Sequence, residues 1–149
     1  MIIYNVPKLS AIELINGREY NYIGDSALLY DEYLLNFRVR PSRVVHRVSQ
    51  RQTLPVCCKD LEFCNKRIAI IDSSTTFRPL DTKQRIDVLI VSKNPKLYVS
   101  DLVRSFSIGH IVIDASVPVW KARLWKRDCD SLGIDCFDVR EKGAFVMNL

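Results

Sequence analysis

Two apolar runs in the second half of the chain, each followed at once by polar residues, constrain the fold more than any other feature. They are IDVLIV (86–91) and HIVIDAS (110–116). Continuous apolar runs of this length are typical of strands buried on both faces, as in a parallel sheet. The stretch between them, YVSDLVRSF (98–106), predicts a short helix with Ser100 as its cap. A strand–helix–strand unit is therefore expected here.

The most definite helix of the sequence follows the second run. Ser116 precedes it, Pro118 falls in its first turn and Gly133 stands at its end, as helix boundaries favour. Its apolar stripe is expected to comprise Ala122, Trp125, Cys129 and Leu132. Two final strands are expected at 134–139 and 143–149. The second half thus alternates strands and helices, which is the pattern of an α/β arrangement.

The first half of the chain predicts antiparallel strands. Three short strands fall within residues 1–24, and Asn16-Gly17 is a strong hairpin signal between the second and the third. A helix over 27–40 is expected to end at Pro41, and residues 41–58 are ambiguous, with one edge strand. A hairpin over 61–71 is expected to turn at Asn65-Lys66. The whole chain is interpreted as one α/β (α+β) domain.

Length and charge limit the possible partners. The chain has 149 residues and a net charge of +5, and no apolar run approaches the roughly 18 residues of a membrane helix. A basic balance favours polyanions such as nucleic acid or an anionic membrane. The first residues do not form a signal peptide and read directly as a strand. They indicate either a piece of a longer protein or a small protein whose first strand starts at once.

Five cysteines leave at least one unpaired and include no CxxC spacing, so a zinc knuckle is not expected. Cys64, Cys129 and Cys136 are interpreted as buried small apolar residues. Cys57-Cys58 could form an exposed thiol pair.

Metal and nucleophile motifs are weak. His46 and His110 belong to no paired motif and are interpreted as structural, and no GxSxG elbow or phosphate-binding glycine loop is present. Asp72 and Asp114 both follow predicted strands and could share a rim, whereas Asp87 precedes its strand and should lie at the opposite end. Such carboxylates more often cap a turn or helix than bind metal.

Basic residues gather in two places and could bind phosphate. A solvated basic face with no ligand is the competing interpretation. The first group comprises Arg38, Arg40, Arg43, Arg47 and Arg51. The second comprises Lys121, Arg123, Lys126 and Arg127 on the predicted helix.

The order of the segments resembles the C-terminal metallo-β-lactamase-like region of ComEC-type competence proteins, and its tail looks closest to those of Bacteroidetes-type bacteria. The opening "YNVPKLSAIELINGREYNYIGD" is similar to that region's D-V-G-Q-G-D-A strand and hairpin, "KRIAIIDSS" to its strand ending in T-G-D, and "DVLIVSKNPK" to its D-V-L-K-V-x-H-H-G-S. The segment from "HIVIDAS" to "GAFVMNL" is similar to its closing elements. The resemblance covers nearly the whole chain.

The resemblance implies a metallo-β-lactamase-like mixed sheet with helices on its outer faces, over a single domain 1–149 that is part of a longer membrane protein. Where the family has H-H-G-S, this chain has Lys93-Asn94-Pro95-Lys96, and no HxHxDH motif is present. The expected vestigial site is Asp72, Lys93, Asn94 and Asp114. A single carboxylate cannot hold two metals, so no metal, no cofactor and no catalytic residue are expected.

The function that the resemblance implies is handling of single-stranded DNA during natural transformation. Lys93 and Lys96, with Lys8, would place positive charge at the former metal site. The expected partners are single-stranded DNA and the membrane-channel part of the same protein, with no small-molecule substrate and with the periplasmic side favoured. Two alternatives stay open: a nuclease with an atypical metal site around Asp72 and Asp114, and a structural domain packing on the channel.

Overall fold

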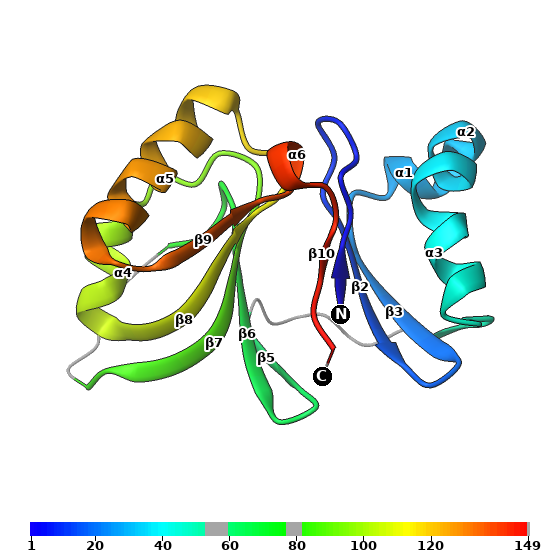
Figure 1. The fold of residues 1–149 in the computed structure, drawn as a ribbon, viewed down its shortest axis with the longest axis horizontal. Helices are drawn as coiled ribbons and strands as arrows, with labels where there is room; N and C mark the ends of the chain where they lie inside the picture. Colours follow the sequence, from blue (N-terminus) through cyan, green and yellow to red (C-terminus); the bar gives the residue numbers. More distant parts are fainter. Residues whose placement is uncertain (53–59, 77–81, 149) are drawn as a thin grey trace.

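Two mixed five-stranded sheets face each other at the centre of the molecule, and helices lie on their outer faces (Figure 1). The computed structural model describes residues 1–52, 60–76 and 82–148. The first sheet has the order β10-β1-β2-β3-β4, in which only β3 and β4 run parallel. Its strands are β1 (Ile2–Ile3), β2 (Ala11–Asn16), β3 (Glu19–Gly24), β4 (Gln50–Gln52) and β10 (Phe145–Val146).

The second sheet has the order β5-β6-β7-β8-β9, and every pair from β6 onwards is parallel. Its strands are β5 (Asp60–Phe63), β6 (Lys66–Ile71), β7 (Gln84–Val91), β8 (Phe106–Ile113) and β9 (Asp135–Asp138). The predicted antiparallel start, the parallel second half and the α+β class are confirmed. The edge strand expected within 41–58 is also confirmed, as β4.

A layer of helices covers each outer face (Figure 1). On the first sheet lie α1 (Ala27–Tyr30), α2 (Glu32–Leu34), the π-helical segment η1 (Leu35–Val39) and α3 (Arg40–Val45). On the second sheet lie α4 (Val99–Ser105) and α5 (Val119–Leu132). The short α6 (Val139–Lys142) connects β9 to β10.

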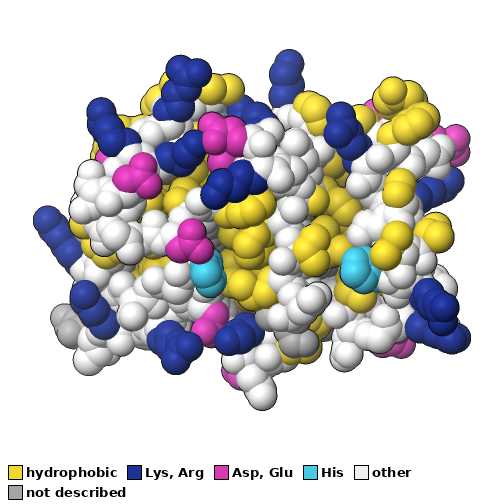
Figure 2. Space-filling view, in the orientation of Figure 1, with side chains coloured by type: hydrophobic (Ala, Val, Ile, Leu, Met, Phe, Trp, Pro, Cys, Tyr) yellow, Lys and Arg dark blue, Asp and Glu magenta, His cyan; other side chains and the backbone are white. Residues whose placement is uncertain are grey.

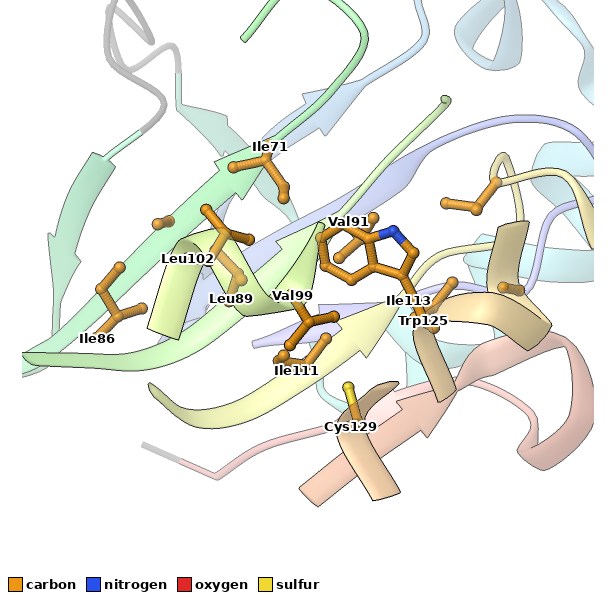
Figure 3. Close-up of a cluster of buried hydrophobic side chains, with 13 residues drawn as sticks. Ile71, Ile86, Leu89, Val91, Val99, Leu102, Ile111, Ile113, Trp125 and Cys129 are labelled. Atoms are coloured by element: carbon orange, nitrogen blue, oxygen red, sulfur yellow. The ribbon is translucent and has the colours of Figure 1, made fainter. Parts of the chain in front are cut away.

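Apolar side chains cover both faces of strand β7. In β7, Val88 and Ile90 pack between the two sheets with Ile12 of β2. The alternate residues of β7, Leu89 and Val91, face α4 and α5 and surround Trp125, which is fully buried (Figure 3). A strand with helices on one side and a sheet on the other is apolar on both faces, which explains the unbroken run.

The predicted helix over 27–40 is wrong in both its continuity and its end. It breaks at Asp31, which has an extended backbone and whose carboxylate accepts a hydrogen bond from the Leu34 amide at 3.0 Å. The helical run then passes Pro41 and ends at Val45. Pro41 lies in the first turn of α3, where no amide donor is needed, so it is tolerated there.

Several smaller predictions also differ from the structure. The hairpin turn falls on Cys64-Asn65, both with positive φ, because Phe63 pairs with Lys66. Cys64 at this turn is therefore exposed, while Cys129 is buried as predicted and Cys136 is half-buried. The pair Cys57-Cys58 lies outside the described residues. Two predicted helix positions are wrong: Tyr98, not Ser100, precedes α4, and Leu132 of α5 is exposed.

Candidate functional site

The carboxyl ends of β6, β7 and β8 meet at one edge of the second sheet because these strands run parallel. We call this edge, together with the loop that joins β1 to β2, the upper rim (Figure 1). Ser92 follows β7 and Asp114 follows β8, and the Ser92 amide donates to the Ile71 carbonyl at the end of β6. The rim is where the family resemblance would place a metal site.

A buried carboxylate occupies the centre of the upper rim. Asp114 has no exposed surface, and its Oδ2 accepts a hydrogen bond from the Ser92 hydroxyl at 2.6 Å. Its Oδ1 accepts from the Ser116 amide at 2.9 Å and from the Ser116 hydroxyl at 2.5 Å. Ser10, from the β1–β2 loop, lies 3.2 Å from Ser92 between the two hydroxyl oxygens. We call Ser10, Ser92, Asp114 and Ser116 the Asp114 cluster.

The environment of Asp114 disfavours its charge. Burial raises the pKa of the Asp114 carboxyl above its usual value, and hydrogen bonds from the hydroxyls of Ser10, Ser116 and Ser92 offset only part of that rise. Both carboxylate oxygens are already bound by protein donors. No group of three or more histidine, cysteine, aspartate or glutamate side chains in the described part of the chain is arranged to hold a metal ion.

Lys93 lies on the solvent side of the Asp114 cluster. Its amide donates to the Ser116 hydroxyl at 2.7 Å, and its ammonium lies 3.2 Å from a carboxylate oxygen of Asp25. Asp25 in turn accepts from the Ser10 amide at 2.8 Å. The positive charge predicted at this position is therefore present and is paired within the protein.

The other residues of the predicted vestigial site do not join this cluster. Asp72 caps its own turn, because its Oδ1 accepts from the Ser74 amide at 2.8 Å and from the Thr75 hydroxyl. Asn94 and Lys96 are exposed on the rim, as is Lys8. Of the predicted set, Lys93 and Asp114 share a neighbour, because the Ser116 hydroxyl accepts from the Lys93 amide and donates to the Asp114 carboxylate.

Four residues of the site were not among the predicted site residues: Ser10, Ser92, Ser116 and Asp25. Ser116 was predicted only at the start of a helix. Ser10 and Ser92 are 82 positions apart, so no local pattern links them. The sequence feature that could have pointed to this cluster is a serine at three predicted strand ends or turns, namely Ser10, Ser92 and Ser116.

The remaining titratable candidates have structural partners. Asp87 was expected to precede its strand, but it lies in the middle of β7, and its carboxylate accepts a hydrogen bond from the Arg67 amide at 3.0 Å. That hydrogen bond, more than its ion pairs, holds the pKa of the Asp87 carboxyl below its usual range. His110 contacts Asp135 at 2.7 Å, and His46 is exposed after α3.

The first group of basic residues lies on the α1–α3 side of the molecule. Arg38, Arg40, Arg47 and Arg51 are exposed. Arg43 is not: its guanidinium bonds to the buried Glu13 carboxylate at 2.9 and 2.5 Å and lies over the Tyr20 ring at 4.2 Å. Arg43 therefore contributes to the core of this layer rather than to its surface.

The second basic group lies on α5, on the opposite side of the molecule (Figure 1). Lys121 is buried, with its ammonium 5.1 Å from the centre of the Tyr98 ring, and Lys126 pairs with Glu141 at 2.5 Å. Arg123 and Arg127 are exposed and line a surface groove of about 390 Å³ with Trp120 and Leu124. Because the two helical layers face away from each other, the two groups do not form one surface.

Comparison with known proteins gives one informative result. No curated protein matches this chain, and no solved structure matches it. In the described residues, no helix is long and apolar enough to cross a membrane. The model of the ComEC C-terminal domain family matches residues 1–149. ComEC proteins belong to the inner-membrane machinery that takes up DNA in competent cells, and on this match the chain belongs to the ComEC C-terminal domain family.

Proposed function

We propose that this domain is a non-catalytic module of a ComEC-type DNA-uptake protein and that it contacts single-stranded DNA in transit. The observation that supports this most is the groove on α5, in which Trp120, Arg123 and Arg127 lie together. We call these three residues the α5 strip. An exposed tryptophan beside arginines has the chemistry of a single-strand platform, because bases stack on the ring and phosphates bind the guanidinium forks.

The spacing of the α5 strip suits a strand running along the helix. Positions 120, 123 and 127 follow the i, i+3, i+7 pattern, so their side chains share one face of α5. The Trp120 side chain is 61% exposed although it is one of the largest apolar groups of the chain. Stacking on aromatic rings tolerates any base, which fits a protein that must accept DNA of any sequence.

We propose that the domain has no catalytic activity, and the arrangement of the Asp114 cluster is the reason. Its carboxylate is bound by Ser92 and Ser116, and Lys93 lies at the position where the resembled family has a metal-binding histidine. A lysine ammonium at that position repels a cation. The two mixed sheets with helices on both outer faces support a metallo-β-lactamase-like origin for this fold. We propose that the domain keeps that scaffold without its metal chemistry.

The rim lysines give a second, weaker contribution to the same function. Lys8 and Lys96 are exposed near Lys93 on the upper rim. They would attract phosphates at long range, and salt would screen this effect. The channel part of the same protein is the proposed neighbour, and the periplasmic side is the proposed location.

Fluorescence anisotropy of a labelled oligothymidine at two salt concentrations tests the proposal. Saturable binding that weakens with salt is expected, and quenching of tryptophan emission should accompany it. Trp125 is fully buried, so the quenched signal reports Trp120. Trp120→Ala should weaken binding about tenfold, the loss of one stacked base. Arg127→Gln should lower the salt slope by about 0.7, the value for one lost single-strand phosphate contact.

Arg18→Gln is the matched control, because it removes one exposed charge from the β2–β3 turn of the other sheet. It should leave both affinity and slope unchanged. If the wild-type chain shows no saturable binding at low salt, or if Arg18→Gln weakens binding as much as Arg127→Gln does, the α5 strip is not a DNA site.

A further inference from the structure

The α1–α3 layer is apolar on both of its faces. Leu28 and Val39 point inward and pack against Ile2 and Tyr4 of the first sheet. A surface helix layer is expected to be polar on its outer side. Here the opposite is found: among the described residues, five of the ten exposed large hydrophobic side chains lie in this layer. They are Tyr30, Tyr33, Phe37, Val44 and Val45, which we call the outer helical face.

These side chains are well exposed. Tyr30 is 86% exposed and Val44 and Val45 are each 76% exposed, while Tyr33 and Phe37 lie together with ring centres 4.6 Å apart. A concentration of exposed apolar groups on this scale marks an interaction surface rather than scattered surface hydrophobicity. Figure 2 shows apolar and basic side chains side by side on the right of the molecule, over the α1–α3 layer of Figure 1.

Arginines accompany the outer helical face. Arg38 and Arg40 are exposed within the same run of helices, Arg47 is exposed in the turn that follows it, and Arg40 bonds to Asn36 at 2.5 Å. The acidic residues of the run are Glu32, which is exposed, and Asp31, whose carboxylate caps α2. Both lie near its start, so the part from Phe37 onwards combines apolar groups with positive charge. The ligand that complements this combination has apolar groups beside phosphates.

We propose that the outer helical face binds a membrane surface that contains anionic phospholipids. The arginine forks would bind lipid phosphates, the tyrosine rings and hydroxyls would lie at the headgroup level, and Phe37 with the two valines would reach the start of the acyl chains. Bases could stack on Tyr33 and Phe37 too, but the apolar face continues to Val44 and Val45, which offer no ring, so lipid complements more of the face than single-stranded DNA does. The α1–α3 layer and the α5 strip lie on opposite sides of the molecule (Figure 1), so one domain could bind lipid and DNA at once.

Flotation of the chain with lipid vesicles tests the proposal. Vesicles of phosphatidylcholine with phosphatidylglycerol should carry the protein upward, and pure phosphatidylcholine vesicles should carry much less of it. The double variant Tyr33→Ser/Phe37→Ser should bind the anionic vesicles about tenfold less. Arg38→Gln/Arg47→Gln should bind them about 25-fold less, since each basic group near an anionic surface contributes about fivefold. The matched control is Leu132→Ser, which removes an exposed apolar side chain from α5 in the opposite layer and should float like the wild type.

Each alternative occupant has its own signature in the same experiments. If Tyr33→Ser/Phe37→Ser weakens oligothymidine binding and leaves flotation unchanged, the face binds DNA and the proposal is overturned. If the wild type does not float and is a dimer that the double variant converts to monomer, the face is a self-association surface, and the proposal fails again. Val44→Ser/Val45→Ser, at the other end of the layer, repeats the test if the first variant unfolds at a lower temperature.

Discussion

Ser92 donates its hydroxyl to Asp114 at 2.6 Å, and this single contact joins the ends of two neighbouring parallel strands around a fully buried carboxyl group. A buried carboxylate is stabilised only when its oxygens receive hydrogen bonds. Here serine hydroxyls donate those hydrogen bonds, so the polar side chains of the upper rim bind one another.

Removing the Asp114 side chain should destabilise the domain more than removing its charge. Asp114→Ala leaves the hydrogen-bond donors of Ser92 and Ser116 without an acceptor inside the protein and should lower the free energy of unfolding by about 2 to 4 kcal/mol. Asp114→Asn keeps an acceptor and removes the cost of burying a charge, so its unfolding free energy should stay within about 1 kcal/mol of the wild type. Urea unfolding at neutral pH compares the two variants.

The pH dependence of the same variants tests the protonation of Asp114. The pKa of this carboxyl is raised in the folded state, so the folded protein holds its proton more tightly than the unfolded chain does. The stability that this group contributes is fully present below its unfolded pKa of about 3.8 and is lost as pH rises through the folded pKa. Asp114→Asn should therefore gain stability relative to the wild type from about pH 4 upward. The reverse trend would mean that the hydroxyls outweigh burial.

Arg43→Ala should be strongly destabilising although it removes a basic residue near the surface. Glu13 is fully buried, and it also accepts a hydrogen bond from the Tyr4 hydroxyl at 2.7 Å. Loss of the guanidinium leaves this charge unpaired inside the protein, which typically costs about 3 to 5 kcal/mol. Arg40→Ala is the control and should change the unfolding free energy by less than about 0.5 kcal/mol. Equal effects of the two substitutions in urea unfolding would contradict the assignment of Arg43 to the core.

Gly24 should tolerate no side chain. It has φ of +154°, and a Cβ atom there would lie 2.2 Å from the Ser10 carbonyl oxygen, which is backbone and cannot swing aside. Gly24→Ala must shift the β1–β2 loop and should lower the melting temperature by many degrees. Gly17→Ala tests the same strain without the clash, because nothing lies within 4 Å of its Cβ position. Its cost should be only about 1 kcal/mol.

Divalent metal ions should not stabilise the folded domain. The oxygens of Asp114 are bound to Ser92 and Ser116, so a metal would have to displace protein donors. Melting curves in excess Mn²⁺ or Zn²⁺ and in chelator should coincide. A ligand at a hundred times its dissociation constant adds about 2.7 kcal/mol of stability. A rise of several degrees with metal, with DNA cleavage, would instead establish a nuclease with an atypical site.

The sequence predicted best those elements whose signals are local. The helix from Val119 to Leu132 has Pro118 before it and Gly133 after it in the left-handed conformation, so its limits were visible in the sequence. The buried ends of β7 and β8 were also visible as apolar runs, but β8 begins at Phe106, four residues before its predicted start, because its first half is partly exposed and lacks the apolar signal. The break at Asp31 was not, since it depends on a side-chain cap that competes with the apolar spacing around it.

The site was predicted less completely because its members come from separate parts of the chain. Asp114 and Lys93 follow adjacent parallel strands, but they were predicted together only from the family resemblance, whereas the strand-end rule had paired Asp114 with Asp72. Ser10 arrives from the other sheet, so its place beside Ser92 depends on how the two sheets face each other. Charge counting also treated Arg43 and Lys121 as surface groups, although Glu13 and the Tyr98 ring hold them inside.

The pairing of β1 with β10 has a consequence for synthesis on the ribosome. Ile3 lies opposite Phe145, and the amino group of Met1 donates to the Met147 carbonyl at 2.8 Å. Within this domain, residues 1–3 therefore cannot complete their sheet until residues 145–147 have been synthesised. Until then one edge of β1 stays open to pairing with other chains. Pairing of the two ends of the domain therefore both completes the first sheet and covers that open edge.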